Sequence, residues 1–245
     1  MIAFNKRLFA ALVGLSLAAC ANAAGDAPAN LKADIQKKFP NRPIESVRTT
    51  PLKGIYEVVM EGRQIIYTDN RGDFILVGDL VDVKNKVSLT ESRMKELTRV
   101  DFASLPLDKA LKLVRGTGAR KVAVFSDPDC PFCKKIERET IAKLDNVTVY
   151  TFLYPLAQLH PDAARKSALI WCAADRQKAW QGWMFEGKLP EGSDSCPNPV
   201  ADTVALADKL GINGTPAMVF ESGELVSGAI PVEEFEAKLS AKKTK

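Results

Sequence analysis

Residues 121–133 carry the sequence KVAVFSDPDCPFC, which holds the clearest structural signal of the chain. Lys121–Phe125 is a short apolar run typical of a buried strand, and the turn-forming residues Ser126–Asp129 follow it. Cys133, Ile136, Thr140 and Leu144 follow one another at spacings of three and four, which predicts one face of a helix. Two cysteines separated by two residues therefore lie where a strand passes into a helix.

The two cysteines are expected to differ in reactivity. Cys130 falls at the predicted helix N-terminus, where unpaired backbone N–H groups and the helix dipole stabilise a thiolate. Such a position can lower a cysteine pKa from ~8.5 to between about 3.5 and 7.5. We therefore predict that Cys130 is the attacking sulfur and that Cys133, one turn inside the helix, is the protected resolving one. Pro131 suits the first helical turn, and Pro131 and Phe132 form the dipeptide between the thiols.

Other uses of a CxxC motif fit the sequence less well. A zinc site needs further ligands, but the chain has no second CxxC motif and a single histidine, His160. A permanent structural disulfide would gain little, because stabilisation from chain entropy grows with the length of the closed loop. An inert reduced pair is weaker still. The motif therefore predicts a dithiol that exchanges disulfides with other proteins without a metal or another cofactor, and His160 is expected to be an ordinary loop residue.

Two further cysteines are expected to form a structural disulfide. The chain has five cysteines, and Cys172 and Cys196 remain once Cys20 and the reactive pair are assigned. Closing the loop between them, of about 25 residues, would contribute roughly 3 kcal/mol in the chain-entropy model. The alternatives are two separate buried thiols and a second redox pair. The redox pair is disfavoured because neither cysteine has a neighbouring CxxC partner.

The N-terminus has the three parts of a secretory signal peptide. Lys6 and Arg7 precede the apolar run Leu8–Ala19, which is too short to span a bilayer, and the small-residue site Ala21–Ala23 follows. We predict that residues 1–23 are a signal peptide. The mature protein would then reach an oxidising compartment, where disulfide chemistry has substrates.

A second cleavage site would keep Cys20. The segment Leu17–Cys20 resembles a bacterial lipobox, in which Cys20 would become the lipidated first residue. We favour cleavage after Ala23, because the small residues there form a good signal-peptidase site. The lipoprotein remains the alternative.

The composition gives no reason to expect nucleic-acid binding. Cleavage after Ala23 lowers the formal net charge from +4 to +2, which is far from a basic footprint. The Lys-rich end, Lys238–Lys245, is expected to be a solvated tail. Apolar content and length are ordinary for a globular chain of one or two domains.

The N-terminal part predicts a small domain over residues 24–85. Leu31–Phe39 has apolar residues every four positions, which indicates a short helix that ends at Pro40. Three strand-like runs follow, separated by turn residues, and predict an antiparallel meander: Ile55–Met60, Gln64–Thr68 and Phe74–Val77. So small a sheet has little core of its own, so a partner surface would stabilise it.

A linker helix over residues 86–105 is predicted next, since Ser88 and Glu91 have the spacing of a capping box. The second domain, residues 106–245, is expected to begin with a short helix, Pro106–Leu111, before the Lys121 strand. Later elements follow from the apolar pattern: a strand over Val147–Leu153, a helical block over about 160–210, a hairpin over Ala217–Val226 and a helix from Pro231. The three tryptophans of the helical block are expected to be core residues.

The tripeptide Gly214–Pro216 is the second informative motif. A Thr-Pro bond at a strand entrance, behind a glycine, is a plausible cis site. If this strand lies beside the Cys130 helix start, the Thr215 backbone offers hydrogen bonds to an incoming peptide. An ordinary loop with a trans Pro216 is the alternative.

The order of these motifs resembles the thioredoxin fold. A strand, a CxxC motif at a helix start, a helical insertion, Thr-Pro, a hairpin and a closing helix follow one another. The whole mature chain resembles the DsbC/DsbG group of bacterial periplasmic disulfide isomerases. The resemblance rests on the N-terminal domain, the linker helix and four stretches of sequence: Phe125–Cys133, Ile170–Ala173, Cys196 and Gly214–Ala217.

Membership of this group implies fold and partners. The fold would combine α+β and α/β parts, with a small antiparallel-sheet dimerisation domain, a linker helix and a thioredoxin-like domain with a helical insertion. The resemblance implies a periplasmic homodimer whose uncharged cleft holds misfolded, disulfide-containing exported proteins. A DsbD-like membrane reductase would keep Cys130 and Cys133 reduced.

The resemblance also implies roles for residues. Cys130 and Cys133 would catalyse isomerisation, and Thr215 and Pro216 would hold the substrate strand. Where many relatives carry Gly-Tyr, this chain has Pro131-Phe132, so the balance between isomerase and oxidase activity is open. We therefore expect a disulfide isomerase with some chaperone activity. The alternatives are a net oxidant, a client-specific reductase, or a protein that is mainly a holdase chaperone.

Overall fold

The computed structural model describes residues 27–241. The predicted signal peptide, including Cys20, and the end of the Lys-rich tail lie outside the described residues. None of the described helices combines the length and the apolar character that crossing a membrane requires.

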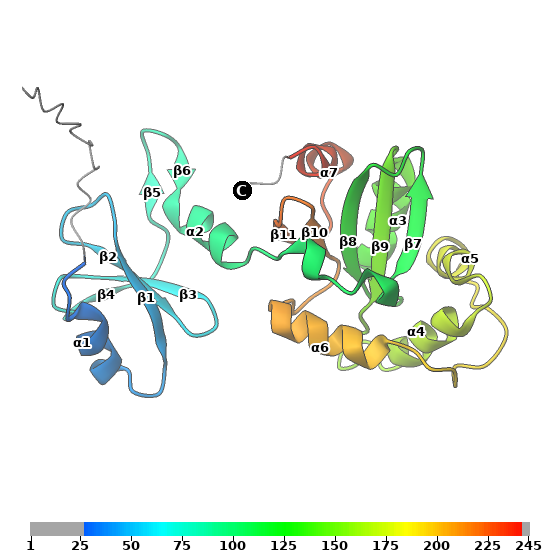
Figure 1. Cartoon of the computed structure of the whole chain (residues 1–245), viewed down its shortest axis with the longest axis horizontal. Coiled ribbons are helices and arrows are strands. Elements are labelled where there is room, and N and C mark those ends of the chain that lie inside the picture. The colour runs from blue at the N-terminus through cyan, green and yellow to red at the C-terminus, as the bar shows by residue number, and fades with distance from the viewer. Residues whose placement is uncertain (1–26, 242–245) are drawn as a thin grey trace, which may run out of the picture. The chain divides into compact units, whose positions relative to one another are not determined.

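The described chain forms two compact units, which we treat separately. One contains residues 27–61 and 66–77, and the other contains residues 62–65 and 78–241. The first unit is a four-stranded sheet with strand order β1-β2-β3-β4 and one helix against it (Figure 1). Its elements are α1 (Leu31–Lys38), β1 (Ile44–Thr49), β2 (Tyr56–Met60), β4 (Ile75–Leu76) and β3 (Gln64–Thr68), of which the first two residues cluster with the other unit.

Helix α1 packs its apolar side against this sheet. Leu31 and Ile35 are buried together with Ile44, Val58 and other sheet residues. Strand β1 pairs antiparallel with β2, and β3 pairs antiparallel with β4. The predicted meander lacked β1, because only Ile44 of that strand is buried and its sequence has no apolar run.

A two-stranded ribbon leads into helix α2 (Leu89–Leu97). The ribbon consists of β5 (Val81–Asp82) and β6 (Val87–Ser88), which pair antiparallel. Ser88 caps α2, since its hydroxyl accepts a hydrogen bond from the Glu91 N–H at 3.0 Å. The helix therefore begins where the capping pattern placed it, but it occupies only nine residues of the linker helix predicted over residues 86–105.

The second unit is built on a five-stranded sheet with strand order β11-β10-β8-β9-β7. Strands β8 and β9 are parallel, and the other neighbours are antiparallel. The strands are β7 (Leu111–Arg115), β8 (Arg120–Ser126), β9 (Val147–Leu153), β10 (Ala217–Phe220) and β11 (Leu225–Ser227).

The short helix predicted over Pro106–Leu111 was wrong in extent. Leu107–Lys109 forms a single 3-10 turn, and Leu111 is already the first residue of β7. The alternation of apolar and charged side chains from Leu111 onward suits an edge strand, which explains why this segment does not continue as a helix.

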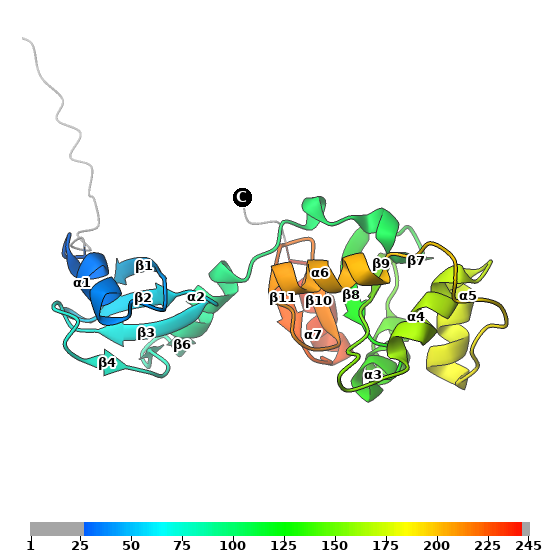
Figure 2. The ribbon, with the colours of Figure 1, turned by 90° about the horizontal axis from the view of Figure 1, so that it is seen from below.

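Helices cover both faces of the sheet (Figure 2). Ala123 and Phe125 of β8 pack toward α6, whereas Val122 and Val124 pack with residues of α3 and α7. Successive side chains of a strand point to opposite faces, so every second residue of β8 faces α3. The bounds of these helices are Pro131–Glu139 for α3, Val200–Leu210 for α6 and Val232–Leu239 for α7.

The segment between β9 and β10 is largely helical. It contains α4 (Ala163–Cys172), α5 (Arg176–Gln181), the π-helical turn η4 (Gly182–Glu186) and α6. Trp171 and Trp180 are buried and pack in one cluster with Cys130 and Cys133. The insertion is therefore part of the wall behind the two thiols.

Candidate active site

The strand-to-helix junction brings the two free thiols together. Cys130 is the N-cap residue of α3, and Pro131 is the first helical residue. Cys133 lies in the first turn of the helix and is fully buried, while Cys130 is 5% exposed. Phe132, between them, is 61% exposed.

The two thiols have opposite pKa shifts. A hydrogen bond from Cys133 is the main cause that lowers the pKa of Cys130 to about 5, and burial partly opposes it. The Thr215 hydroxyl and the first backbone N–H groups of α3 lower the pKa of Cys130 further. Burial, first of all, and the neighbouring Cys130 raise the pKa of Cys133 above its usual range. One sulfur is therefore a stable thiolate at neutral pH, and the other is a thiol.

The loop before β10 lies against Cys130. The Thr215–Pro216 peptide bond is cis, and the Thr215 carbonyl oxygen lies 3.5 Å from Cys130 Sγ, within hydrogen-bonding distance when Cys130 is protonated. Strand β10 pairs with β8, so Ala217 lies opposite Phe125, close to the end of the strand that leads to Cys130. The sheet register thus brings together two motifs that are 85 residues apart.

Asp127 connects the CxxC turn to the loop after β9. Its carboxylate is fully buried and accepts hydrogen bonds from Leu156 N–H at 2.6 Å and Asp129 N–H at 2.7 Å. The same carboxylate is 3.0 Å from Nδ1 of His160. His160 lies in a loop as expected, but sequence analysis missed its contact with the site, because that contact joins residues 33 positions apart.

Trp183 braces the turn before Cys130 from the other side. Its indole N–H donates to the Pro128 carbonyl oxygen at 2.6 Å. The ammonium groups of Lys134 and Lys166 lie 4.7 and 4.6 Å from the centre of its ring. Lys166 also forms an ion pair with Asp129 at 2.7 Å. Trp183 therefore holds positive charge beside the CxxC turn, which goes beyond the core role expected of it.

A second buried carboxyl group lies on α3. Glu137 follows Cys133 by one helical turn, and its Oε1 accepts a hydrogen bond from the Trp180 indole at 2.9 Å. Burial raises the pKa of Glu137 to about 7, although the Trp180 hydrogen bond and Arg115 oppose the shift. Sequence patterns did not predict this buried acid. Glu137 lies on helix α3, and the apolar run of the Lys121 strand contains no acidic residue.

Cys172 and Cys196 are joined by a disulfide, with Cα atoms 5.7 Å apart. Cys172 is the last residue of α4, and Cys196 lies in the irregular segment before α6. The bond therefore ties this segment to α4, and Cys196 packs against the apolar cluster that contains Cys130 and Cys133.

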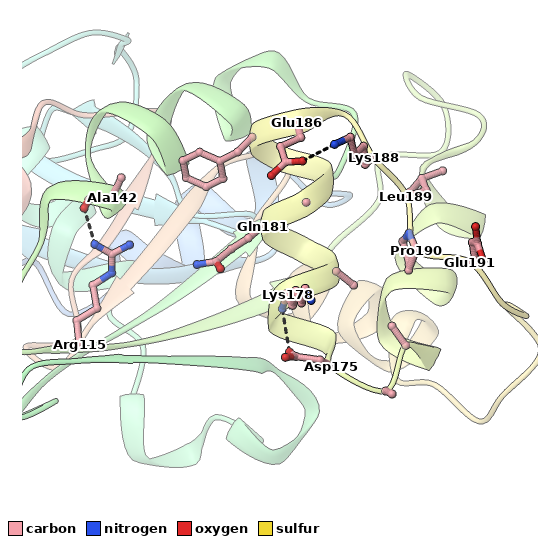
Figure 3. Close-up of a pocket in the computed structure, with 15 residues that line it drawn as sticks. Arg115, Ala142, Asp175, Lys178, Gln181, Glu186, Lys188, Leu189, Pro190 and Glu191 are labelled. Carbon is pink, nitrogen blue, oxygen red and sulfur yellow. Dashed lines mark hydrogen bonds and ion pairs between the residues drawn. The ribbon is translucent and has the colours of Figure 1, made fainter.

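Two of the hollows on the described part of the second unit are large. One, of about 810 Å³, lies along α5 and η4 (Figure 3). In it Arg115 donates to the Ala142 carbonyl oxygen, and Lys188 pairs with Glu186 at 2.9 Å. Its lining contains neither the CxxC turn nor Thr215, so we assign it no part in the dithiol site.

The other hollow, of about 960 Å³, reaches the loop before β10. The loop Tyr154–Leu159 forms one wall, and apolar residues of α6 such as Val200 and Val204 form the other. Asn213, two residues before Thr215, also lines this hollow. Its lining also lacks the CxxC turn and Thr215, but it includes Asn213 of the loop that carries Thr215.

Family models match most of the chain. The model described as the thioredoxin-like domain matches residues 107–243. The model described as the disulfide bond isomerase protein N-terminal domain matches residues 21–91. Both parts of the chain thus match a known domain family.

Curated proteins and a solved structure agree with these matches. The chain is 42% identical over 209 residues to the probable thiol:disulfide interchange protein DsbC of Bordetella pertussis, covering 85% of this chain and 73% of that protein. It is 28% identical over 207 residues to the thiol:disulfide interchange protein DsbC of Escherichia coli, covering 82% and 84% of the two chains. The crystal structure of a disulfide interchange protein from Neisseria gonorrhoeae aligns with a TM-score of 0.54 and 52% identity, covering 58% of this chain and 100% of that one.

Proposed function

Because this chain belongs to the DsbC family of thiol:disulfide interchange proteins, we propose that it is a protein disulfide isomerase that rearranges non-native disulfides in exported proteins. The observation that carries the proposal is the contrast between a Cys130 pKa of about 5 and a buried, protonated Cys133. A thiolate that is available at neutral pH attacks disulfides, and a protected thiol beside it can end the reaction.

The reaction begins at Cys130. Its thiolate attacks one sulfur of a client disulfide, forms a mixed disulfide and releases the other client sulfur as a thiolate. A correct client thiol can then displace Cys130, which leaves the client isomerised and the enzyme reduced. When no such thiol arrives, Cys133 attacks Cys130 and releases the client.

The Thr215–Pro216 loop is proposed to hold the client strand. It contacts the Cys130 sulfur through the Thr215 carbonyl, and a second strand laid beside it would bring its own cysteine to Cys130. The hollow lined by Asn213, the Tyr154–Leu159 loop and apolar residues of α6 would accept an apolar side chain of an unfolded client. These contacts also support the chaperone activity expected beside disulfide exchange.

The N-terminal domain, proposed to span residues 24–85, would join two copies of the chain. Phe74–Val77 carries four exposed apolar side chains, with Phe74 70% exposed, and includes the edge strand β4. An exposed apolar edge strand is a template for pairing with another chain. We propose a homodimer through this strand, with residues 86–105 as the linker to the catalytic domain, residues 106–245.

The cellular setting is proposed from the family and the N-terminal sequence. Signal cleavage after Ala23 would release the chain into the periplasm. There a DsbD-like membrane reductase would return the Cys130–Cys133 disulfide to the dithiol after each oxidation. Trapping the thiols in cells with an alkylating agent tests this, since loss of the reductase should shift the pair from reduced to oxidised.

Reactivation of a scrambled, fully oxidised multi-disulfide protein in glutathione buffer tests the proposed activity. The mature protein should restore client activity, and the Cys130→Ala variant should be inactive. A variant that still reactivates the client would refute the role of Cys130.

The low pKa of Cys130 also fits a net oxidant, which is the second candidate function. The same assay separates the two. Rapid oxidation of a fully reduced client, without reactivation of a scrambled one, would assign the protein to the oxidants.

A further inference from the structure

The resolving cysteine, Cys133, must carry a negative charge on a buried sulfur atom. In the proposed function, on which this inference rests, Cys133 must become a thiolate before it can attack the mixed disulfide. Cys133 is fully buried, and a charge without partners is costly in such a place. The protein therefore needs hydrogen-bond donors that meet the Cys133 sulfur inside the fold.

One donor already touches this sulfur. The backbone N–H of Asp127 points at Cys133 Sγ, with the nitrogen 3.4 Å away. The Asp127 side chain is unsuited to the task, because its carboxylate is an acceptor that binds two backbone N–H groups and lies beside His160. The main chain after β8 thus supplies one hydrogen bond to the resolving sulfur.

The neighbouring residue, Ser126, supplies a hydroxyl on the same side. It is the last residue of β8, and strand alternation puts its side chain on the face of Val122 and Val124, which α3 covers. Ser126 is fully buried, and its hydroxyl has no hydrogen-bond partner. It lies close enough to Cys133 to lower the pKa of that thiol, against the larger effect of burial.

A buried hydroxyl without a partner lowers the stability of a fold, so its presence calls for a reason. Within residues 27–241, five buried side-chain atoms have no partner: those of Ser126, Ser167, Gln177, Thr203 and Thr215. Two of these, Ser126 and Thr215, act on the pKa of the two free thiols. The hydroxyls of Ser126 and Thr215, which have no hydrogen-bond partner, therefore lie beside the two sulfur atoms that carry negative charge during exchange.

We propose that the Ser126 hydroxyl and the Asp127 backbone N–H form a thiolate-binding site for Cys133, which is occupied while Cys133 resolves the mixed disulfide. In the resting dithiol the Cys133 sulfur is neutral, so it is only a weak hydrogen-bond acceptor for the Ser126 hydroxyl. When Cys133 ionises, both donors bind its thiolate, and the hydroxyl gains its partner. Ser126 is thus a catalytic residue of the resolving step.

The step balances without an outside reagent. The Cys133 thiolate attacks Cys130 Sγ, the Cys130–Cys133 bond forms, and the bond from Cys130 to the client sulfur breaks. The electron pair of the broken bond leaves with the client sulfur, so the client is reduced and the dithiol is oxidised. The proton that Cys133 has lost is matched by the one that the client thiolate takes up.

A two-step colour reaction tests the proposal. The reduced mature protein is mixed with a dinitrobenzoate disulfide whose thiolate product is yellow. Attack by Cys130 releases one product molecule in a bimolecular phase, and attack by Cys133 releases a second in a unimolecular phase. Stopped-flow absorbance at several pH values gives both rates, and a melting curve reports the stability of each variant.

Ser126→Ala should leave the first phase unchanged and slow the second by roughly tenfold or more, because it removes a hydrogen bond to a charged atom. The pH dependence of the second phase should move to higher pH. The substitution leaves the other titratable residues near Cys133 in place, namely Cys130, Asp127 and Glu137. The melting temperature should stay the same or rise. Ser126→Thr, which keeps the hydroxyl, should retain the second phase.

Ser167→Ala is the matched control, since Ser167 is also a fully buried serine without a hydroxyl partner. It should leave both phases unchanged. If Ser126→Ala does not fold, the pair Ser126→Thr and Ser126→Val, which differ only in the hydroxyl at nearly equal volume, decides the question. A slower second phase in the valine variant supports the proposal, and equal rates overturn it.

An unchanged second phase and pH profile in folded Ser126→Ala would overturn the role of Ser126 while dithiol exchange stands. A wild-type protein that releases no second product molecule would instead refute the proposed dithiol function, and this inference with it.

Discussion

The reactivity of Cys130 depends on its neighbour within the motif. The hydrogen bond from Cys133 contributes most to the low pKa of Cys130, more than the backbone N–H groups of the helix start. Sequence analysis assigned the acidity to the helix N-terminus, because that position can be read from the pattern. The larger effect needs the two sulfurs to be in contact, which only the folded turn specifies.

Cys133→Ala should therefore raise the pKa of Cys130 from about 5 toward its ordinary value of 9.0. Ultraviolet absorbance of the thiolate, followed against pH, measures this pKa. The titration of Cys130 should then move from the acid side of neutrality to neutral or alkaline pH. An unchanged midpoint near pH 5 would mean that the helix N-terminus alone sets the acidity.

Glu137 couples stability to pH. Its pKa is about 7 in the folded protein and 4.5 ordinarily, so between these values the folded state holds a proton that the unfolded state has released. The free energy of unfolding should therefore fall as pH rises from 4.5 to 7, by about 3 kcal/mol from this group alone. Glu137→Gln cannot ionise and should lack this loss.

Urea unfolding of both proteins at several pH values measures the difference. Wild type should lose stability relative to Glu137→Gln between pH 4.5 and 7, with no further change above pH 7. Glu139→Gln is the control, because Glu139 lies on the same helix with a largely exposed side chain. A constant difference across this range would contradict the raised pKa.

At the scale of elements, the interior strands and the edge strands β4 and β11 were predictable from their sequence, and the edge strands β1 and β7 were not. Strand β9 has the predicted bounds Val147–Leu153, and β10 begins at Ala217, where the predicted hairpin begins; both strands are buried on both faces of the sheet. Strands β1 and β7 lie at sheet edges and mix charged with apolar side chains, so their sequences carry a weaker pattern. The contacts of Glu137 and His160 were missed for a related reason, because burial by a distant helix or loop leaves no local signal.

The Cys172–Cys196 disulfide should stabilise the helical insertion without taking part in exchange. Replacing both cysteines by serine opens a loop of 24 residues and should cost roughly 3 kcal/mol in free energy of unfolding. Denaturant unfolding measures the loss, and the first phase of the colour reaction shows whether Cys130 is intact. A large loss of Cys130 reactivity in the folded variant would give this disulfide a catalytic role.

At the scale of the whole molecule, the proposed dimer depends on an exposed apolar strand. Val77 and Leu76 are 75% and 56% exposed in the single chain, on the edge strand β4 and directly after it. A monomer would leave this surface in water, whereas pairing of two β4 strands would cover it and satisfy the free backbone groups of the edge. The two-unit architecture fits this arrangement, since the thiols lie in the other unit.

Leu76→Lys should weaken the dimer by about a hundredfold or more, because association would then bury an unpaired charge on each chain. Light scattering over a dilution series should give twice the chain mass for wild type and a shift to the single chain for the variant. Val114→Lys is the matched control, because Val114 is a half-exposed apolar residue on β7, the edge strand of the other sheet. If Leu76→Lys remains a dimer at the same concentrations at which Val114→Lys remains one, β4 is not the interface. If only Leu76→Lys dissociates, reactivation assays on the monomer will show whether isomerisation needs two thiol sites in one particle.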